Sequence, residues 1–140
     1  MANSHFQQAF DTQRWARPVK GATGQNIDRG RGVRMTGLPT VAGGLHEVTV
    51  CAAGERPHGV SAMSNTVNIT PANIGTKVVT CDGPQFEICV DAAYAAGTKV
   101  KVTTSDGKFG AAGMGIAEFE LMEASGADGD ICWAYRCAVL

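Results

Sequence analysis

The last third of the chain alternates apolar and polar residues in short runs, and each run ends at a cluster of turn-forming residues. The run at residues 98–103 has the period of two that is typical of a half-buried β-strand. Residues 117–121 and 131–139 repeat this chemistry. Gly, Asp and Ser separate the runs at 105–107 and 126–130, where they favour tight turns. The C-terminal third is therefore predicted to be a small β-structure.

Strand-like segments also precede this region. Residues 47–51, 59–63, 77–81 and 86–91 are each bounded by turn residues, and their spacing is close to the roughly 8–12 residues of sandwiches and barrels. A short helical turn is conceivable only at residues 91–96. The predicted fold is all-β: a small, single-domain β-barrel or β-sandwich over residues 35–140, with an extended N-terminal arm over residues 1–34.

Residues 1–34 differ from the rest in charge. They hold six basic and two acidic residues, a net charge of plus four, whereas residues 35–140 hold six basic and eleven acidic residues, a net charge of minus five. The segment is also rich in Gln and Gly and poor in residues that fill a core. It is predicted to be a basic arm that docks on a partner of complementary charge.

Four residues of this arm are the candidate binding site: Arg14, Trp15, Arg17 and Lys20. Arg and Trp are common anchors of protein interfaces. Two other interpretations stay open, namely a poorly ordered terminus without a role and a nucleic-acid-binding arm. Six basic residues over 34 positions are few for nucleic acid, so a protein partner is favoured.

The order of several segments resembles the capsid decoration proteins of tailed bacteriophages, also called cement or head-stabilising proteins. The resemblance covers about residues 40–140, and each motif is short and based on glycine, so that order and spacing carry it. The matching segments are AGTKVKV (96–102), SDGK (105–108), GDICWAYRCAVL (129–140) and the Arg-Pro corner with its following strand at 54–62. The N-terminal region is longer and richer in Gln than the family pattern.

The resemblance implies a β-tulip-like fold and a structural protein of the virion, without enzymatic activity or a cofactor. Such a protein binds the outer surface of the assembled capsid, stabilises it, and forms homotrimers at threefold and quasi-threefold positions. Its partners are then the major capsid protein and copies of itself, not nucleic acid or a membrane. It would be assembled on the capsid in the host cytoplasm.

Five cysteines are spaced without the close pairs of a zinc site. Their number is odd, and the N-terminus carries no secretion signal, so packing in the core is favoured over a disulfide or a metal site. They are Cys51, Cys81, Cys89, Cys132 and Cys137.

No motif indicates catalysis. The three histidines are dispersed, and His58 beside Pro57 is expected to line a turn. Glu118 and Glu120 share a strand face, which favours the solvent face of a strand or an interface rim over an acid–base pair. The glycine-rich residues 110–115 match no phosphate-binding loop and are expected to form a bend.

Trp133 and Tyr135 are expected to share one face of the last strand. Packing in the core or against another subunit is the commoner fate of such aromatic residues. A carbohydrate- or host-surface-binding β-module is nevertheless an alternative function, and a small hydrolase that depends on His58 or Glu118 is another.

Overall fold

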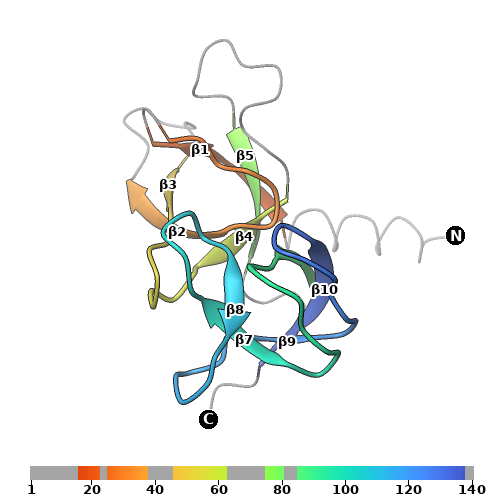
Figure 1. Ribbon diagram of the computed structural model, residues 1–140. Coiled ribbons are helices and arrows are strands. Elements are labelled where there is room, and N and C mark those ends of the chain that lie inside the picture. The colour runs from red at the N-terminus through yellow and green to blue at the C-terminus, as the bar shows by residue number, and fades with distance from the viewer. Residues whose placement is uncertain (1–15, 23–24, 38–45, 63–74, 81–84, 138–140) are drawn as a thin grey trace, which may run out of the picture.

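The computed structural model describes residues 16–22, 25–37, 46–62, 75–80 and 85–137 (Figure 1). Within these ranges the chain forms ten β-strands and no helix, so the all-β prediction is confirmed. The strands are β1 (Ala16–Gly21), β2 (Gly32–Gly37), β3 (Glu47–Val50), β4 (Gly59–Ser61), β5 (Gly75–Thr80), β6 (Gln85–Cys89), β7 (Lys99–Val102), β8 (Phe109–Ala111), β9 (Phe119–Leu121) and β10 (Ile131–Arg136). In this part of the chain, no helix has the length and apolarity to cross a membrane.

The first five strands form a small closed barrel. They pair in the order β1-β3-β2-β4-β5, and β5 pairs back with β1. Only the β1–β3 pair is parallel. Figure 1 shows the barrel nearly end-on, as a ring in the upper half of the molecule. Its core is small and consists of Val19, Ile27, Val33 and Val48, with Met35 and Val50 packed at its margin.

The last five strands form a second, antiparallel sheet in the order β6-β10-β9-β7-β8. An isolated parallel bridge between Val90 and Phe109 joins the two edges of this sheet, which therefore curls around its own core. At the centre of that core, the ring of Phe119 packs edge to face against the rings of Phe86 and Phe109. The ring centroids lie 5.0 Å and 5.2 Å apart, respectively. Phe86 and Phe109 come from the two edge strands.

The alternation of the sequence explains which faces are buried. In β7, Val100 and Val102 are buried and Lys99 is exposed, and in β9 Phe119 and Leu121 are buried on either side of Glu120. All seven strands predicted from residue 47 onwards are present, although all of them except β5 are shorter than predicted. Residues 91–96, the one candidate for a helical turn, are not helical, and Tyr94 instead forms a bridge to Ser125.

The boundary expected at residue 34 is wrong, because β1 and β2 belong to the barrel. The segment from Ala16 onwards contributes Val19, Ile27 and Val33 to the barrel core, each with no exposed surface. Three apolar residues in a polar, glycine-rich segment are too few to predict a strand from composition, yet they make up most of the core of this small barrel. Residues 1–15 of the expected arm lie outside the described residues.

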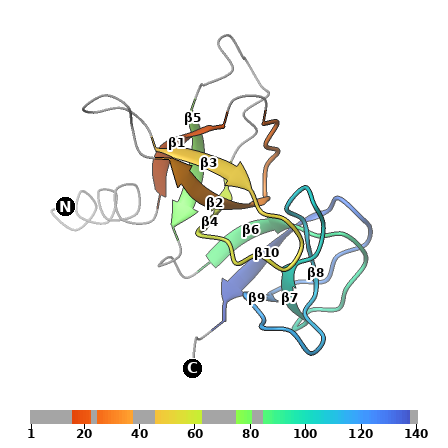
Figure 2. The same cartoon turned by 90° about the vertical axis from the view of Figure 1, so that its left-hand side faces the viewer.

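The barrel and the second sheet lie one above the other in Figures 1 and 2, and backbone hydrogen bonds join them. Gly30 stands at this junction: its N–H donates to the Ser61 carbonyl at 2.7 Å, and its carbonyl accepts from the Cys89 N–H at 2.9 Å. The buried Ser61 hydroxyl donates to the Asp28 carbonyl at 2.5 Å and accepts from the Arg31 N–H. We refer below to the contact of β4 and the β1–β2 and β3–β4 connections with β6, the β7–β8 turn and the segment before β9 as the junction.

Replacement of Gly30 by any other residue is expected to destabilise the fold, for two reasons. Its φ of +80° lies in the left-handed region, which costs other residues about 1–2 kcal/mol. A Cβ atom at this position would also lie 2.7 Å from the Cys89 backbone nitrogen. Gly54, in the β3–β4 connection, has a φ of +83°, but a Cβ atom there would meet nothing within 4 Å, so it shares the first cost and not the second.

We expect Gly30→Ala to lower the free energy of unfolding by about 2 kcal/mol more than Gly54→Ala, because only the first substitution adds the cost of overpacking. Urea unfolding of both variants, followed by circular dichroism, measures the difference. Equal destabilisation by the two substitutions would show that the close approach at the junction is unimportant.

Candidate functional site

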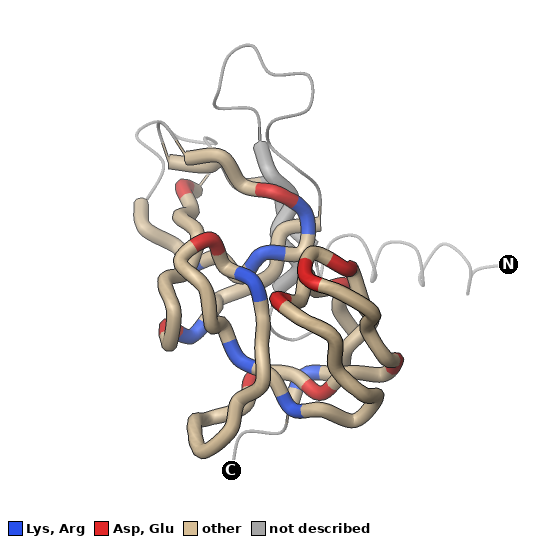
Figure 3. Tube along the Cα trace, in the orientation of Figure 1, with Lys and Arg blue, Asp and Glu red and all other residues tan. Residues whose placement is uncertain are grey.

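Ion pairs cross the junction at three places. Arg29 pairs with Glu87 of β6, Arg31 with Asp106 of the β7–β8 turn at 2.6 Å, and Arg56 with Glu118 before β9 at 2.8 Å. Figure 3 shows Lys and Arg positions beside Asp and Glu positions around this contact. Part of the charge complementarity that the sequence predicts for a separate partner is therefore satisfied within the chain.

The structure corrects the prediction for Glu118. Its side chain is only 4% exposed, whereas the sequence pattern favoured the solvent face of a strand or the rim of an interface. Strand alternation does turn Glu118 away from Phe119, but the connection between β3 and β4 covers it there and supplies Arg56 as its partner. Glu120, two residues further, is partly exposed, so the two carboxylates do not share an environment.

The four predicted arm residues are only partly described. Arg14 and Trp15 lie outside the described residues. Arg17 and Lys20 lie on β1, where their backbones pair with Val78 and Gly75 of β5, and their side chains belong to the part that is not described.

The histidines and cysteines are placed as follows. His58 lies in the β3–β4 connection, and its Nδ1 accepts from the Met35 N–H at 2.8 Å. Cys51, Cys89 and Cys132 are buried, which confirms core packing for these three, whereas Cys137 is partly exposed and Cys81 lies outside the described residues. Burial raises the pKa of the Cys89 and Cys132 thiols, so they stay protonated at neutral pH.

No cluster of three or more potential metal ligands occurs among the His, Cys, Asp and Glu residues that the structure describes. The glycine-rich residues 110–115 begin in β8 and continue into the β8–β9 connection, as the expected bend requires. The tip of this connection exposes Met114 fully and Ile116 largely.

Trp133 and Tyr135 share the outer face of β10, as predicted, while Cys132 and Ala134 between and beside them point into the core. Their exposed fractions are 43% and 45%. Of the two expected environments, packing in the core is wrong, because the core residues of β10 lie on its other face. Packing against another subunit stays a prediction. The outer face of β10 is left available for a ligand or another protein.

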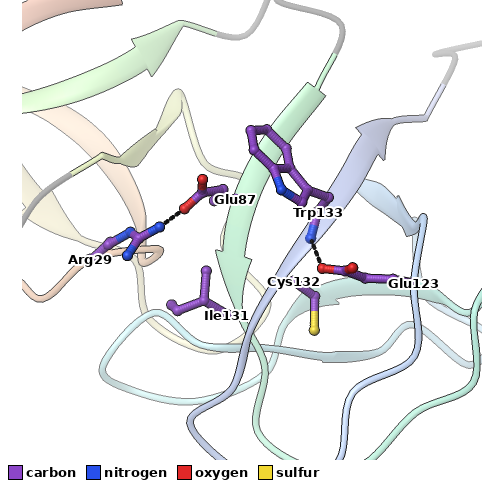
Figure 4. A pocket seen from close by; sticks show the side chains of 6 residues that line it. All are labelled: Arg29, Glu87, Glu123, Ile131, Cys132 and Trp133. Atoms are coloured by element: carbon purple, nitrogen blue, oxygen red, sulfur yellow. Dashed lines mark hydrogen bonds and ion pairs between the residues drawn. The ribbon is translucent and has the colours of Figure 1, made fainter.

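A hollow of about 170 Å³ lies beside Trp133 on this face (Figure 4). It is lined by Arg29, Glu87, Glu123, Ile131, Cys132 and Trp133. Figure 4 shows Glu87 between Arg29 and Trp133, with Ile131 below them and Glu123 on the other side of the Trp133 backbone. Glu123 Oε1 accepts from the Trp133 backbone N–H at 3.1 Å. We call this site the β10 hollow.

The sequence pattern found only part of the β10 hollow. The Trp-x-Tyr pattern of residues 133–135 marked the outer face, and it was the one signal that the sequence offered. Arg29 and Glu87 are 58 positions apart in the sequence and meet only because the junction joins the barrel to the second sheet. No local spacing could have indicated that pair.

The Arg56–Glu118 pair provides a test of the charge pattern at the junction. Arg56→Ala leaves the buried Glu118 carboxylate without its partner, which we expect to cost about 1–3 kcal/mol of the free energy of unfolding. Arg34→Ala is the control, because the side chains of Arg34 and Glu55 are about half exposed. Arg34 Nε lies 2.9 Å from Glu55 Oε2 without the alignment of a hydrogen bond. Its cost should stay below about 1 kcal/mol in urea titrations, and a larger cost than that of Arg56→Ala would contradict this interpretation.

Asp106 gives the junction a dependence on acid. Burial raises its pKa, but hydrogen bonds from Thr104 and Arg31 and the Arg31 charge outweigh burial and hold the pKa below its usual 3.8. Its contribution to stability is therefore present above pH 3.8 and is lost as the pH falls through the lower pKa of the folded state. We expect the difference in unfolding free energy between the unsubstituted protein and Asp106→Asn to shrink below pH 3.8. A difference independent of pH would contradict this.

Comparisons with known proteins find a similar fold but no matching family. No protein-family model matches the chain, and neither does any curated protein sequence. Among solved structures, the chain is similar to the crystal structure of the head fibre gp8.5 N base in bacteriophage phi29, with a TM-score of 0.64 and 11% sequence identity. The alignment covers 87% of this chain and 92% of that chain. This chain therefore has a fold like that of a phage head fibre base.

Proposed function

We propose that this protein is a structural component of a phage virion that binds the outer surface of the assembled capsid and stabilises it. The observation that carries the proposal is the similarity of fold to the head fibre base of phage phi29 over nearly the whole of both chains. The decoration-protein pattern of residues 40–140 supports the same class of protein independently, because it rests on sequence order and not on shape.

The proposed role needs no catalysis. A protein that binds the assembled shell, and not its dissociated subunits, shifts the equilibrium towards the shell by mass action. Many copies at equivalent positions add their contributions. We further propose homotrimers at threefold and quasi-threefold positions, where heterologous contacts between copies close into a ring.

We assign capsid binding to the N-terminal segment that holds Arg14, Trp15, Arg17 and Lys20. The pairing of Arg29 and Arg31 with acidic groups at the junction supports this choice, because those two cations already have partners within the chain. The remaining basic residues of the first 34 positions, apart from Arg34 with Glu55, are the ones assigned to the capsid.

The fold decides how this assignment can be tested. A deletion that reaches residue 20 removes most of β1, whose pairing with β5 closes the barrel, and would confound loss of binding with loss of structure. Deletion of residues 2–15 removes Arg14 and Trp15 and leaves β1 whole. The double substitution of Arg14 and Trp15 by Ala is a milder form of the same test.

We expect the full chain to bind undecorated, expanded capsids saturably, with three copies at each threefold and quasi-threefold position, and to raise the melting temperature of the shell. Sedimentation with gel densitometry measures the copies per shell. The 2–15 deletion should keep its circular dichroism spectrum and oligomeric state but no longer sediment with capsids. Lys99→Ala, an exposed cation on the second sheet, is the control and should bind normally.

Absence of saturable binding to capsids of its own phage would overturn the proposed function. Normal binding by the 2–15 deletion would retain the function and remove Arg14 and Trp15 from it. Light scattering of the free protein tests the trimer separately.

A further inference from the structure

The β10 hollow combines an apolar ring with unused polar atoms. Trp133 presents a half-exposed indole beside Ile131. Glu123 uses one carboxylate oxygen for the Trp133 backbone N–H, and neither its other oxygen nor the indole N–H has a hydrogen-bond partner in the described part of the chain. The hollow therefore offers a flat apolar surface, an acceptor and a donor within one small space.

An ion pair holds the opposite wall of the hollow in place before any ligand binds. Arg29 is held by Glu87, which fixes a planar guanidinium, with several N–H donors, at the edge of the hollow. Because the Arg29 side chain is about half exposed, part of its donor set faces solvent. A ligand that meets this wall does not have to order it.

These features select a class of ligand. A pyranose ring has one apolar C–H face, which packs on an aromatic ring, and a rim of hydroxyl groups that both donate to carboxylates and accept from guanidinium N–H groups. Two carboxylates against one guanidinium give the lining a net charge of minus one, which disfavours phosphates, nucleic acids and acidic sugars. The hollow is also smaller than the roughly 300–1,000 Å³ of sites for drug-sized ligands, so that one ring suits it.

Tyr135 extends the same surface. It lies two residues beyond Trp133 on the outer face of β10, about 7 Å away at the rise of a strand. A saccharide unit linked to the one in the hollow can therefore rest on a second aromatic ring. An oligosaccharide fits this surface better than a single sugar does.

We propose that the β10 hollow binds a neutral pyranose unit of an oligosaccharide, with Trp133 as the stacking platform, Glu123 as the hydroxyl acceptor and Arg29 as the donor. The structure thereby assigns the protein a glycan-binding activity of its own. The site is built by one chain, so the activity does not depend on capsid attachment.

The test uses the full-length protein and a panel of neutral oligosaccharides, namely maltohexaose, cellohexaose and chitohexaose, with heparin as the acidic control. Saturation-transfer NMR detects which sugar protons contact the protein. The chain has two tryptophans, so a Trp15→Phe variant reports the fluorescence of Trp133 alone. We expect at least one neutral member to give both signals and heparin to give neither.

Substitutions locate the binding. Trp133→Ala should weaken binding about tenfold or more, and Trp133→Phe, which retains a ring, should weaken it less. Glu123→Gln keeps an oxygen for the Trp133 N–H but removes the charge, and should weaken binding several-fold. Met114→Ala, an exposed apolar residue of the β8–β9 connection, should change nothing.

Three outcomes would overturn the proposal. The first is the absence of a signal from every neutral oligosaccharide up to its solubility limit. The second is binding that Trp133→Ala leaves unchanged. The third is an oligomer that protects Trp133 from acrylamide quenching and that Trp133→Ala dissociates. The last result would make the hollow a contact between copies of this chain.

Discussion

The contact of Phe119 with Phe86 and Phe109 determines the shape of the second sheet. These rings come from a central strand and from both edge strands, so their packing draws the edges together and completes the curl that the Val90–Phe109 bridge closes. Because the inner face of the second sheet is filled in this way, every second residue of β10 has to face outward. The exposure of Trp133 follows from the burial of its neighbours Cys132 and Ala134.

The two halves are joined by polar groups and by a shared part of the core. Backbone hydrogen bonds at Gly30 and the ion pairs of Arg29, Arg31 and Arg56 cross the junction, and Cys51 and Val60 of the barrel side extend the core of the second sheet. Polar contacts are directional, so they specify one relative placement of the halves where a flat apolar contact would allow several. The uneven distribution of charge along the sequence thus acts first within the fold.

Much of the fold could be predicted from the sequence, because alternation and turn residues are local signals. They locate β3 to β7, β9 and β10, and the shared face of Trp133 and Tyr135. They fail for β1 and β2, because Val19, Ile27 and Val33 are too few apolar residues in a Gly- and Gln-rich segment to predict strands, and residues of β3 complete the barrel core. Alternation also predicts that Glu118 points away from the core, but it does not show that Arg56 pairs with Glu118 there and buries it. The β10 hollow escaped prediction for the same reason, since the Arg29–Glu87 pair exists only after the halves meet.

That pair has a mechanical consequence. Arg29 comes from the barrel, whereas the other five residues that line the hollow come from the second sheet and its connections. The hollow is therefore complete only while the two halves are docked, and any molecule that fills it gains contacts with both. Such a molecule acts as a clamp: it adds its own binding free energy to the resistance of the protein against being pulled apart at the junction.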